Sequence, residues 1–210
     1  MNDNSKSYKT GQIRIDTQAK ILEAAEVEFA QFGFKGASMM NIAKRAELPR
    51  PNVHYYFKNK TELYNKVLMN ILTLWNKAFD DFSADNVPAE ALSNYIHAKV
   101  MFSKTNPLAS KIFANEIIHG APHLSDYLNN DYRLWIKNKC NVIQSWIDMG
   151  KMDAINPYHI IFMIWGSTQY YADFSIQVIA TLDEKSLNDE HFDSIANNLI
   201  HIILKGCGIK

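Results

Sequence analysis

Apolar residues recur along this chain at the spacing of amphipathic helices. Near the N-terminus, one such stripe repeats at i, i+4, i+8 and i+11, and it consists of Ile21, Ala25, Phe29 and Phe32. This period of about 3.6 residues predicts a helix with one buried face. Asp16 is a suitable N-cap for it and Gly33 a suitable end.

A longer stripe follows at the same spacing, formed by Leu63, Val67, Ile71, Trp75, Phe79 and Phe82. Asn59 and Glu62 have the spacing of a capping box, so we expect this helix to begin after Asn59. Between the two stripes, Ser38 predicts the N-cap of a short helix over 39–46. Pro49 and Pro51 are tolerated only near a helix start, which predicts a second short helix over about 50–56.

The rest of the chain divides into helical segments at proline and glycine. We expect helices over 89–104, 108–119, 123–149, 157–181 and about 188–205. No strand-type alternation of useful length is present, and eight glycines and six prolines suit long helices with short loops. The predicted fold class is therefore all-α. We expect a flexible arm over 1–14, a three-helix domain over 15–59 and a larger helical domain over 60–210.

Charge is unevenly distributed, although the net charge of the chain is zero. Residues 1–70 hold 11 Lys and Arg against 7 Asp and Glu, a net charge of +4, so the other 140 residues carry −4. A basic head suggests a polyanionic partner for that part only, although ordinary scatter could also produce it. Two widely spaced cysteines and the absence of a signal peptide or membrane span favour a reduced, cytoplasmic protein.

The two short helices, 39–46 and 50–56, have the spacing of a helix-turn-helix, whose second helix enters the major groove of double-stranded DNA. Its first residues, Arg50, Asn52 and His54, carry donors that can read base edges. Phosphate contacts are expected from Lys35, Ser38, Tyr55, Lys58 and Lys60. Simple packing is the alternative for Tyr55 and is expected for Tyr56 and Phe57, and a solvated surface position is the alternative for His54.

The stretch NIAKRAELPRPNVHYYFKNKTELY, from Asn41 to Tyr64, resembles the DNA-binding signature of the TetR family of bacterial repressors. The resemblance rests on Ile42-Ala43, on Tyr55 to Phe57 and on Lys60-x-Glu62-Leu63. It departs from the family at Glu47, where a turn glycine is common, and at Pro49, where a capping Ser or Thr is common. The segments ILTLW, GAP and HIIFMIWGSTQYYADF resemble the pyrimidine-utilisation branch, which implies a repressor released by a small heterocycle such as uracil.

Reading two half-sites of a palindrome requires two recognition units, so we expect a homodimer. In the resembling family the last two helices make the dimer contact. Gly166 and a last-helix stripe at 192, 195, 196, 199 and 203 suit that role, although the stripe could instead close the core of one subunit. Trp165, Gln169 and Asp173 lie on one helix face, and we expect Trp75, Phe113, Glu116, Trp165 and Gln169 to line an effector pocket. Aromatic core packing is the alternative, and Asp173 is expected to pair with a neighbouring helix.

Two other classes of protein are the alternatives to a ligand-responsive regulator. A metal-dependent enzyme would draw on His119 and His123 near Glu116 and Asp126, but Gly120 and Pro122 interrupt the helix that such a pair needs. No phosphate loop or nucleophile motif is present, so neither a metal nor another cofactor is expected. A DNA-binding scaffold without a ligand is the other alternative, and it would lack the pocket.

Overall fold

The computed structural model describes residues 3–77, 79 and 82–209, with side chains from residue 12 onward. In that part of the chain every regular element is a helix. The helices are α1 (Asp3–Gly36), α2 (Met39–Arg45), α3 (Arg50–Tyr56), α4 (Lys60–Lys77), α5 (Pro88–Thr105), α6 (Pro107–Ile118), α7 (Ser125–Asn129), α8 (Asp131–Asp148), α9 (Pro157–Asp173), α10 (Ser175–Leu182) and α11 (Asp189–Gly206). The all-α prediction is confirmed.

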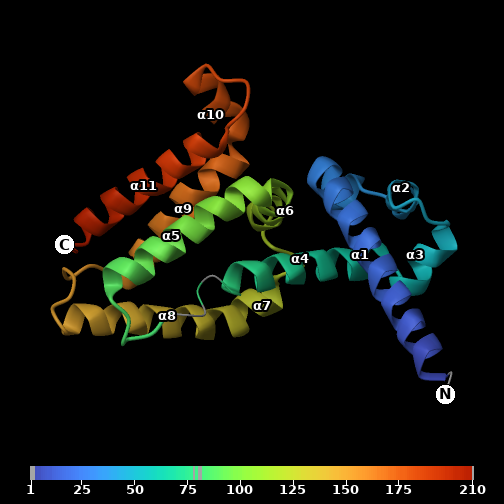
Figure 1. Ribbon diagram of the computed structural model, residues 1–210, viewed down its shortest axis with the longest axis horizontal. Coiled ribbons are helices and arrows are strands. Elements are labelled where there is room, and N and C mark those ends of the chain that lie inside the picture. The colour runs from blue at the N-terminus through green and yellow to red at the C-terminus, as the bar shows by residue number, and fades with distance from the viewer. Residues whose placement is uncertain (1–2, 78, 80–81, 210) are drawn as a thin grey trace. The chain divides into compact units, whose positions relative to one another are not determined.

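Contacts divide the chain into two compact units, Met1–Ile71 and Leu72–Lys210. The division lies inside α4, whereas the sequence placed the boundary at the start of that helix. The first unit contains α1 to α3 and most of α4, in the blue and teal part of Figure 1. The second contains the end of α4 and all later helices.

The first unit is held by an apolar core under the two short helices. Ile21, Phe29, Ile42, Val53 and Leu63 are each buried to 1% exposure or less. The stripe of the first helix therefore packs as expected except at its end, because Phe32 is 48% exposed. The chain kinks at Gly33, whose φ of 65° and ψ of 177° are not helical, which agrees with the predicted end of that helix.

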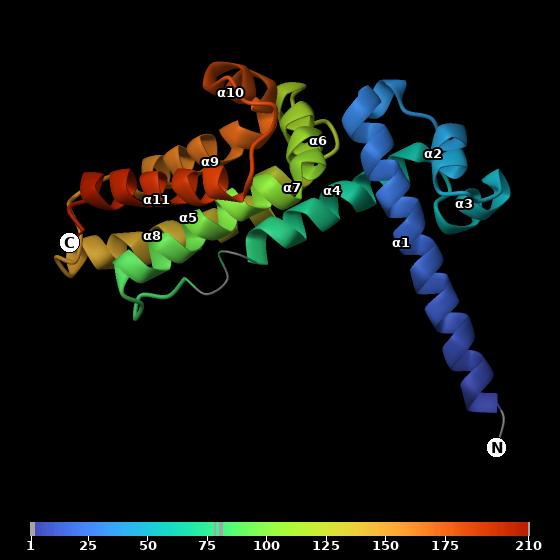
Figure 2. The same ribbon diagram turned by 45° about the horizontal axis from the view of Figure 1, so that its top comes forward.

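Helix α1 begins at Asp3 and not at Asp16. The sequence of 3–15 contains no proline and only one glycine, so nothing in it stops a helix from extending. Most of the segment expected to be a flexible arm thus has a helical backbone, and residues 1–2 of that segment lie outside the described part. Figure 2 shows this extension beyond α2 and α3.

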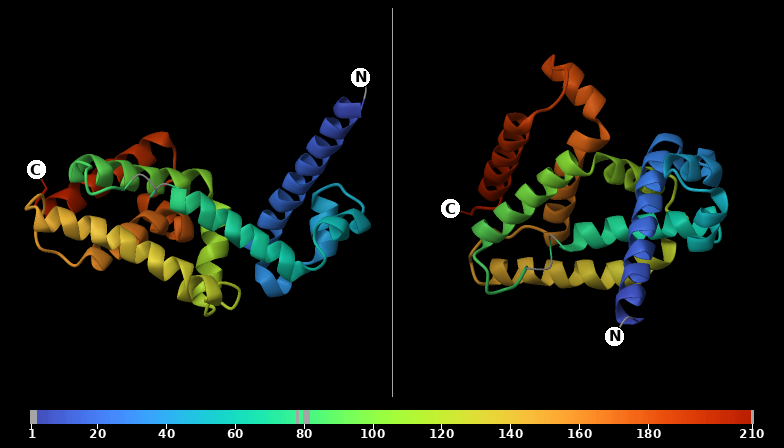
Figure 3. Two further views of the ribbon diagram at one scale, coloured as in Figure 1. Left: turned by 90° about the horizontal axis from the view of Figure 1, so that it is seen from below. Right: turned by 45° about the vertical axis from the view of Figure 1, so that its right-hand side comes forward.

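In the second unit, α5 packs against both α9 and α11, and α6 and α8 pack against α9 (Figures 1 and 3). Their main core contains Phe79, Ile96, Trp146 and Ile161, each fully buried, and Phe82. Among the described residues no helix is long and apolar enough to span a membrane.

Helix starts follow the predicted chemistry. The Ser38 hydroxyl accepts from the Asn41 amide at 3.1 Å, which confirms it as an N-cap, and Asn156 caps α9 in the same way. Proline occupies the first turn of α3, α5, α6 and α9. At α4, the Asn59 side chain accepts from the Glu62 amide, but the Glu62 carboxylate accepts from the Lys58 amide instead of the amide of Asn59.

Three expected helices are shorter or divided. Helix α4 ends at Lys77, before Phe79 and Phe82, although both rings remain in the core. The helix expected over 123–149 is interrupted at Asn130, whose side chain bonds the carbonyl of Asp126. The helix expected over 157–181 is interrupted at Phe174, with φ −113° and ψ 27°.

Candidate functional site

Helix α3 presents a polar outer face because only one of its residues is buried. Val53 is fully buried, whereas Tyr55 is 74% exposed and Arg50 and Asn52 are also exposed. Tyr56 is half-buried and meets the ring of Tyr55 edge-on at 5.3 Å. The helix therefore offers Arg50, Asn52 and Tyr55 to an outside partner, as expected of a recognition helix.

Two consecutive polar contacts link Arg50, His54 and Lys58 along the edge of α3. The Arg50 Nε donates to His54 Nε2 at 3.5 Å, and His54 Nδ1 lies 3.4 Å from the carbonyl oxygen of Lys58. Both contacts fit the arrangement in which Nε2 accepts from Arg50 and Nδ1 donates to the Lys58 carbonyl. His54 is thus held in place beside Arg50, and the ammonium of Lys58 remains at the surface.

Two of the residues expected to bind phosphate are already engaged within the unit. The Lys60 Nζ donates to the carbonyl oxygens of Ala37 at 2.9 Å and Lys35 at 3.3 Å, and it lies 4.8 Å from the centre of the Phe34 ring. The Ser38 amide donates to a carboxylate oxygen of Glu28. Phosphate binding by Lys60 or by the Ser38 amide would therefore compete with these internal bonds, whereas the Lys35 side chain is exposed.

Glu28 is a buried acidic residue that the sequence reasoning missed. It is 1% exposed, and its Oε1 accepts from the Asn41 side chain at 3.0 Å as well as from Ser38. Its Oε2 lies 3.8 Å from Arg45 Nη2. Glu28 therefore ties α1 to both ends of α2 and fixes the first helix of the pair.

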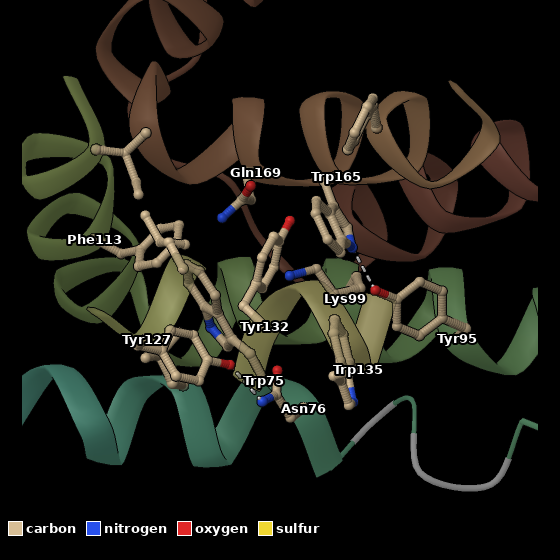
Figure 4. Close-up of a pocket in the computed structure, with 14 residues that line it drawn as sticks. Trp75, Asn76, Tyr95, Lys99, Phe113, Tyr127, Tyr132, Trp135, Trp165 and Gln169 are labelled. Carbon is tan, nitrogen blue, oxygen red and sulfur yellow. Dashed lines mark hydrogen bonds between the residues drawn. The ribbon is translucent and has the colours of Figure 1, made fainter. Parts of the chain in front are cut away.

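The second unit contains a cavity of about 270 Å³. Its lining comes from α4 to α9 and is mostly aromatic: Leu72, Trp75, Asn76, Tyr95, Lys99, Phe113, Ile117, Tyr127, Leu128, Tyr132, Trp135, Phe162, Trp165 and Gln169. Figure 4 shows Gln169 and Lys99 extending toward the space between Trp75, Tyr132 and Trp165. An apolar wall with a few polar groups is typical of a small-molecule site.

Four of the five expected pocket residues, Trp75, Phe113, Trp165 and Gln169, line this cavity. Trp75 and Phe113 meet edge-on at 4.6 Å, and both line the cavity. The Trp165 indole donates to the Tyr95 hydroxyl at 2.5 Å, which fixes its ring plane (Figure 4). We correct our expectation for Glu116, which is not among the lining residues.

Glu116 is 4% exposed and faces the loop after α6. One of its carboxylate oxygens accepts from the His123 amide at 2.6 Å, and the other lies 3.3 Å from His123 Nδ1. The carboxylate thus holds the turn that contains Gly120 and Ala121, both with positive φ. His119 does not share this contact with Glu116, and its Nδ1 lies 2.7 Å from the carbonyl oxygen of Asn115. Over the described ranges, no group of three or more His, Cys, Asp or Glu side chains is placed to hold a metal ion.

Lys99, Tyr95 and Tyr132 are lining residues that the sequence reasoning missed. Burial lowers the pKa of Lys99 to about 8, and the negative charge of Asp173 opposes this shift. Burial raises the pKa of Tyr95, and it raises the pKa of Tyr132 to about 12, so both phenols are neutral at pH 7. Nothing in the sequence indicated that Lys99 lines a cavity, because a lysine in a helix is normally exposed.

Asp173 bonds a neighbouring helix, as the sequence led us to expect. Its Oδ1 accepts from the Ser110 hydroxyl on α6 at 2.5 Å. Burial raises the pKa of Asp173, whereas the Ser110 hydrogen bond and the charge of Lys99 lower it. Asp173 therefore ties the end of α9 to α6, beside the cavity but outside its lining.

Helix α4 contributes to both units. Its N-terminal part carries Leu63, which is buried in the first unit, and its C-terminal part carries Leu72, Trp75 and Asn76 at the cavity. The Asn76 side chain donates to the Tyr127 hydroxyl of α7 at 3.1 Å. A molecule in the cavity would thus touch the same helix that begins in the helix-turn-helix unit.

Comparison with known proteins agrees with both units. The family model "Bacterial regulatory proteins, tetR family" matches residues 21–67, and the model "YcdC-like protein, C-terminal region" matches residues 68–210. The HTH-type transcriptional regulator RutR of Escherichia coli K12 is 40% identical over 186 residues, which cover 89% of this chain and 88% of that protein. An uncharacterised HTH-type regulator of Bacillus subtilis, YhgD, is 27% identical over 71% of this chain and 79% of its own length.

Solved structures share the fold. The regulator SCO4942 of Streptomyces coelicolor has a TM-score of 0.72 at 21% identity, covering 91% of this chain and 98% of its own. AibR, solved with isovaleryl coenzyme A and operator DNA, has a TM-score of 0.69 at 14% identity, covering 89% and 97%. The relatives and neighbours are named as transcriptional regulators and not as enzymes. This chain belongs to the TetR family and is a helix-turn-helix transcriptional regulator.

Proposed function

We propose that the protein is a cytoplasmic repressor that binds a palindromic operator as a homodimer and is released by a small planar molecule. The observation that carries the proposal is the cavity whose wall includes Trp75 and Asn76 of α4. Because α4 also forms part of the DNA-binding unit, a ligand that favours one position of α4 changes the affinity for DNA. The coupling is reciprocal, so operator DNA weakens ligand binding by the same factor.

DNA contact is assigned to α3 and its neighbours. Arg50, Asn52 and His54 are proposed to read bases, and Tyr55 and Lys58, together with Lys35, to bind phosphates. Ser38 and Lys60 remain in this proposal as residues at the edge of the interface, where their internal bonds position the phosphate-binding backbone. The similarity to AibR, whose structure includes operator DNA, supports only the fold of this unit.

Dimerisation is proposed through α9 and α11, but not through the predicted stripe of α11. Phe192, Ala196 and Ile203 of that stripe are buried at 7%, 1% and 4%, and they close the core of the subunit, with Phe192 and Ala196 packed around Val100 of α5. Exposed apolar side chains remain elsewhere on these helices: Tyr158, Phe162, Met163 and Tyr170 of α9 and Ile202 of α11. Gly166 lies in the same row as Phe162 and Tyr170. A Cβ at Gly166 would meet no atom of the subunit within 4 Å, so packing inside the subunit does not require a glycine there. Close approach of a second subunit would require one.

A pyrimidine such as uracil is the first effector to test, since RutR is 40% identical and the flat aromatic cavity suits one ring. The experiment is titration of a fluorescent duplex from the DNA next to the protein's own gene, with and without uracil or thymine. We expect binding by a dimer, measured by light scattering, and release by the ligand. Binding that no ligand changes would favour the DNA-binding scaffold, and a protein that stays monomeric and ignores every duplex would end the proposal.

A further inference from the structure

Lys99 is a buried cation whose ammonium has no hydrogen-bond partner among the protein groups that the structure describes. It lies on α5, is 4% exposed and lines the cavity. Its ammonium lies 4.4 Å from the centre of the Trp75 ring, a cation–π contact that gives its three N–H donors no oxygen acceptor from the described protein residues. Removing an ammonium from water without acceptors is costly, so this position requires a compensating group.

The protein supplies only part of that compensation. The charge of Asp173 acts on Lys99, but the two side chains form no ion pair among the described contacts. The Asp173 carboxylate accepts a hydrogen bond from the Ser110 hydroxyl instead. None of the residues lining the cavity is acidic. The lining of the cavity therefore carries one positive charge and no negative charge.

The other lining groups define the shape of a partner for this cation. Trp135 and Trp165 present nearly parallel indoles, with ring planes 13° apart, and Gln169 offers an amide that both donates and accepts. A volume of about 270 Å³ is at the small end for ligand sites, which suits a single ring. The two ring centres are 6.4 Å apart, so the indoles stack on each other and leave no room for a ring between them, and a flat ligand would lie against one aromatic face.

We propose that Lys99 binds a negatively charged oxygen of the effector, so that the preferred ligands are single-ring organic anions. The proposal rests on the effector function given above and narrows its chemistry. Either a ring carboxylate or the enolate oxygen of an acidic cyclic imide could supply the charge. A neutral pyrimidine offers only a carbonyl oxygen to the ammonium, and it is therefore a weaker ligand.

The test measures affinities by calorimetry at pH 7 for three probes that share a pyrimidine ring: uracil, which is neutral, orotate, which carries a carboxylate, and barbiturate, which carries an enolate. Wild type is compared with Lys99→Met, which keeps the length and removes the charge, and with Lys99→Arg, which keeps the charge. Lys111→Met, at an exposed position of α6 outside the cavity, is the matched control. Circular dichroism and melting confirm that each variant folds.

We expect at least one anion to bind roughly tenfold or more tightly than uracil, because hydrogen bonds to charged groups exceed those to neutral ones by about that factor. Lys99→Met should lose this advantage, so that the anions lose more affinity than uracil does, and Lys99→Arg should retain part of it. Equal binding of uracil and both anions by wild type, or anion binding that Lys99→Met leaves unchanged, overturns the inference and leaves the effector function standing. If none of the three probes binds, the inference and the pyrimidine effector fail together.

Discussion

The Lys99 ammonium lies over the indole of Trp75, 4.4 Å from the ring centre, and this contact joins α5 to the cavity end of α4. An acceptor in the cavity that draws the ammonium away would weaken the contact with α4. In the proposed function, this contact is the point at which a ligand would change the position of the helix that begins in the DNA-binding unit. Only a ligand that prefers one of the two helix positions would act in this way.

The first prediction concerns stability without ligand. Lys99→Met should stabilise the protein below pH 8, because wild type must bury a charged ammonium whose pKa is lowered from 10.5 to about 8. Between pH 8 and 10.5 the unfolded lysine holds a proton that the folded one has lost, so the stability of wild type rises with pH relative to the variant. The advantage of the variant should therefore be largest below pH 8, at roughly 3 kcal/mol or less, and vanish near pH 10.5.

Urea denaturation of both proteins from pH 6 to 10.5 measures this difference. Tyr95 and Tyr132 titrate above that range when folded, and they are present in both proteins, so their contributions cancel. The matched control Lys111→Met should show no such pH dependence. A constant difference between wild type and Lys99→Met would mean that Lys99 does not lose its proton in this window.

Some helix starts could be predicted because their signals are local. Ser38 and the prolines beside α3 act through the first turn alone, and they predicted the starts of α2 and α3, whereas the start expected at Asp16 was wrong because α1 begins at Asp3. The break at Phe174 carries no proline or glycine, and the adjacent Asp173 is held by Ser110 of α6, a contact far away in sequence. Tertiary contacts of this kind cannot be read from one segment.

The site shows the same distinction. Trp165 and Gln169 were found because they share one face of a helix, and Trp75 because it lies on the apolar stripe of α4; both segments also resembled a known family. Lys99 was missed because it becomes unusual only through burial, which depends on α4 and α9. Glu116 was assigned to the cavity from its place on α6, but its side chain bonds the turn at His123.

A second prediction follows from the turn between α2 and α3. Glu47 has a φ of 54°, in the left-handed region where a Cβ costs about 1–2 kcal/mol. Glu47→Gly removes that strain but adds up to about 1 kcal/mol of entropy to the unfolded chain, so a net stabilisation of roughly 0.5–1 kcal/mol is expected. Thermal melting measures it. Glu47→Ala removes the same charge and keeps the strain, so a gain of equal size in that variant would assign the effect to charge.

A third prediction separates base reading from phosphate binding. Arg50→Ala should leave the fold intact, because the side chain is exposed, and should reduce the preference for operator over scrambled duplex by roughly tenfold or more. Lys58→Ala should instead weaken both duplexes alike and lower the salt dependence of binding by about one phosphate contact. Fluorescence anisotropy at several salt concentrations measures both effects. If Arg50→Ala keeps the preference for operator over scrambled duplex, the proposal that α3 reads bases in the major groove is wrong.

The last prediction concerns Gln169, the lining amide that extends into the cavity in Figure 4. Gln169→Ala should weaken the effector by roughly five- to tenfold, because it removes about one hydrogen bond to the ring edge, and should leave operator affinity without ligand within about twofold. Gln144→Ala, at an exposed position of α8, is the matched control and should change neither affinity. Calorimetry for the ligand and anisotropy for the duplex give the two numbers. Equal losses of both affinities would show that Gln169 supports the fold of the second unit, since a residue that meets only the ligand cannot alter DNA binding in the ligand's absence.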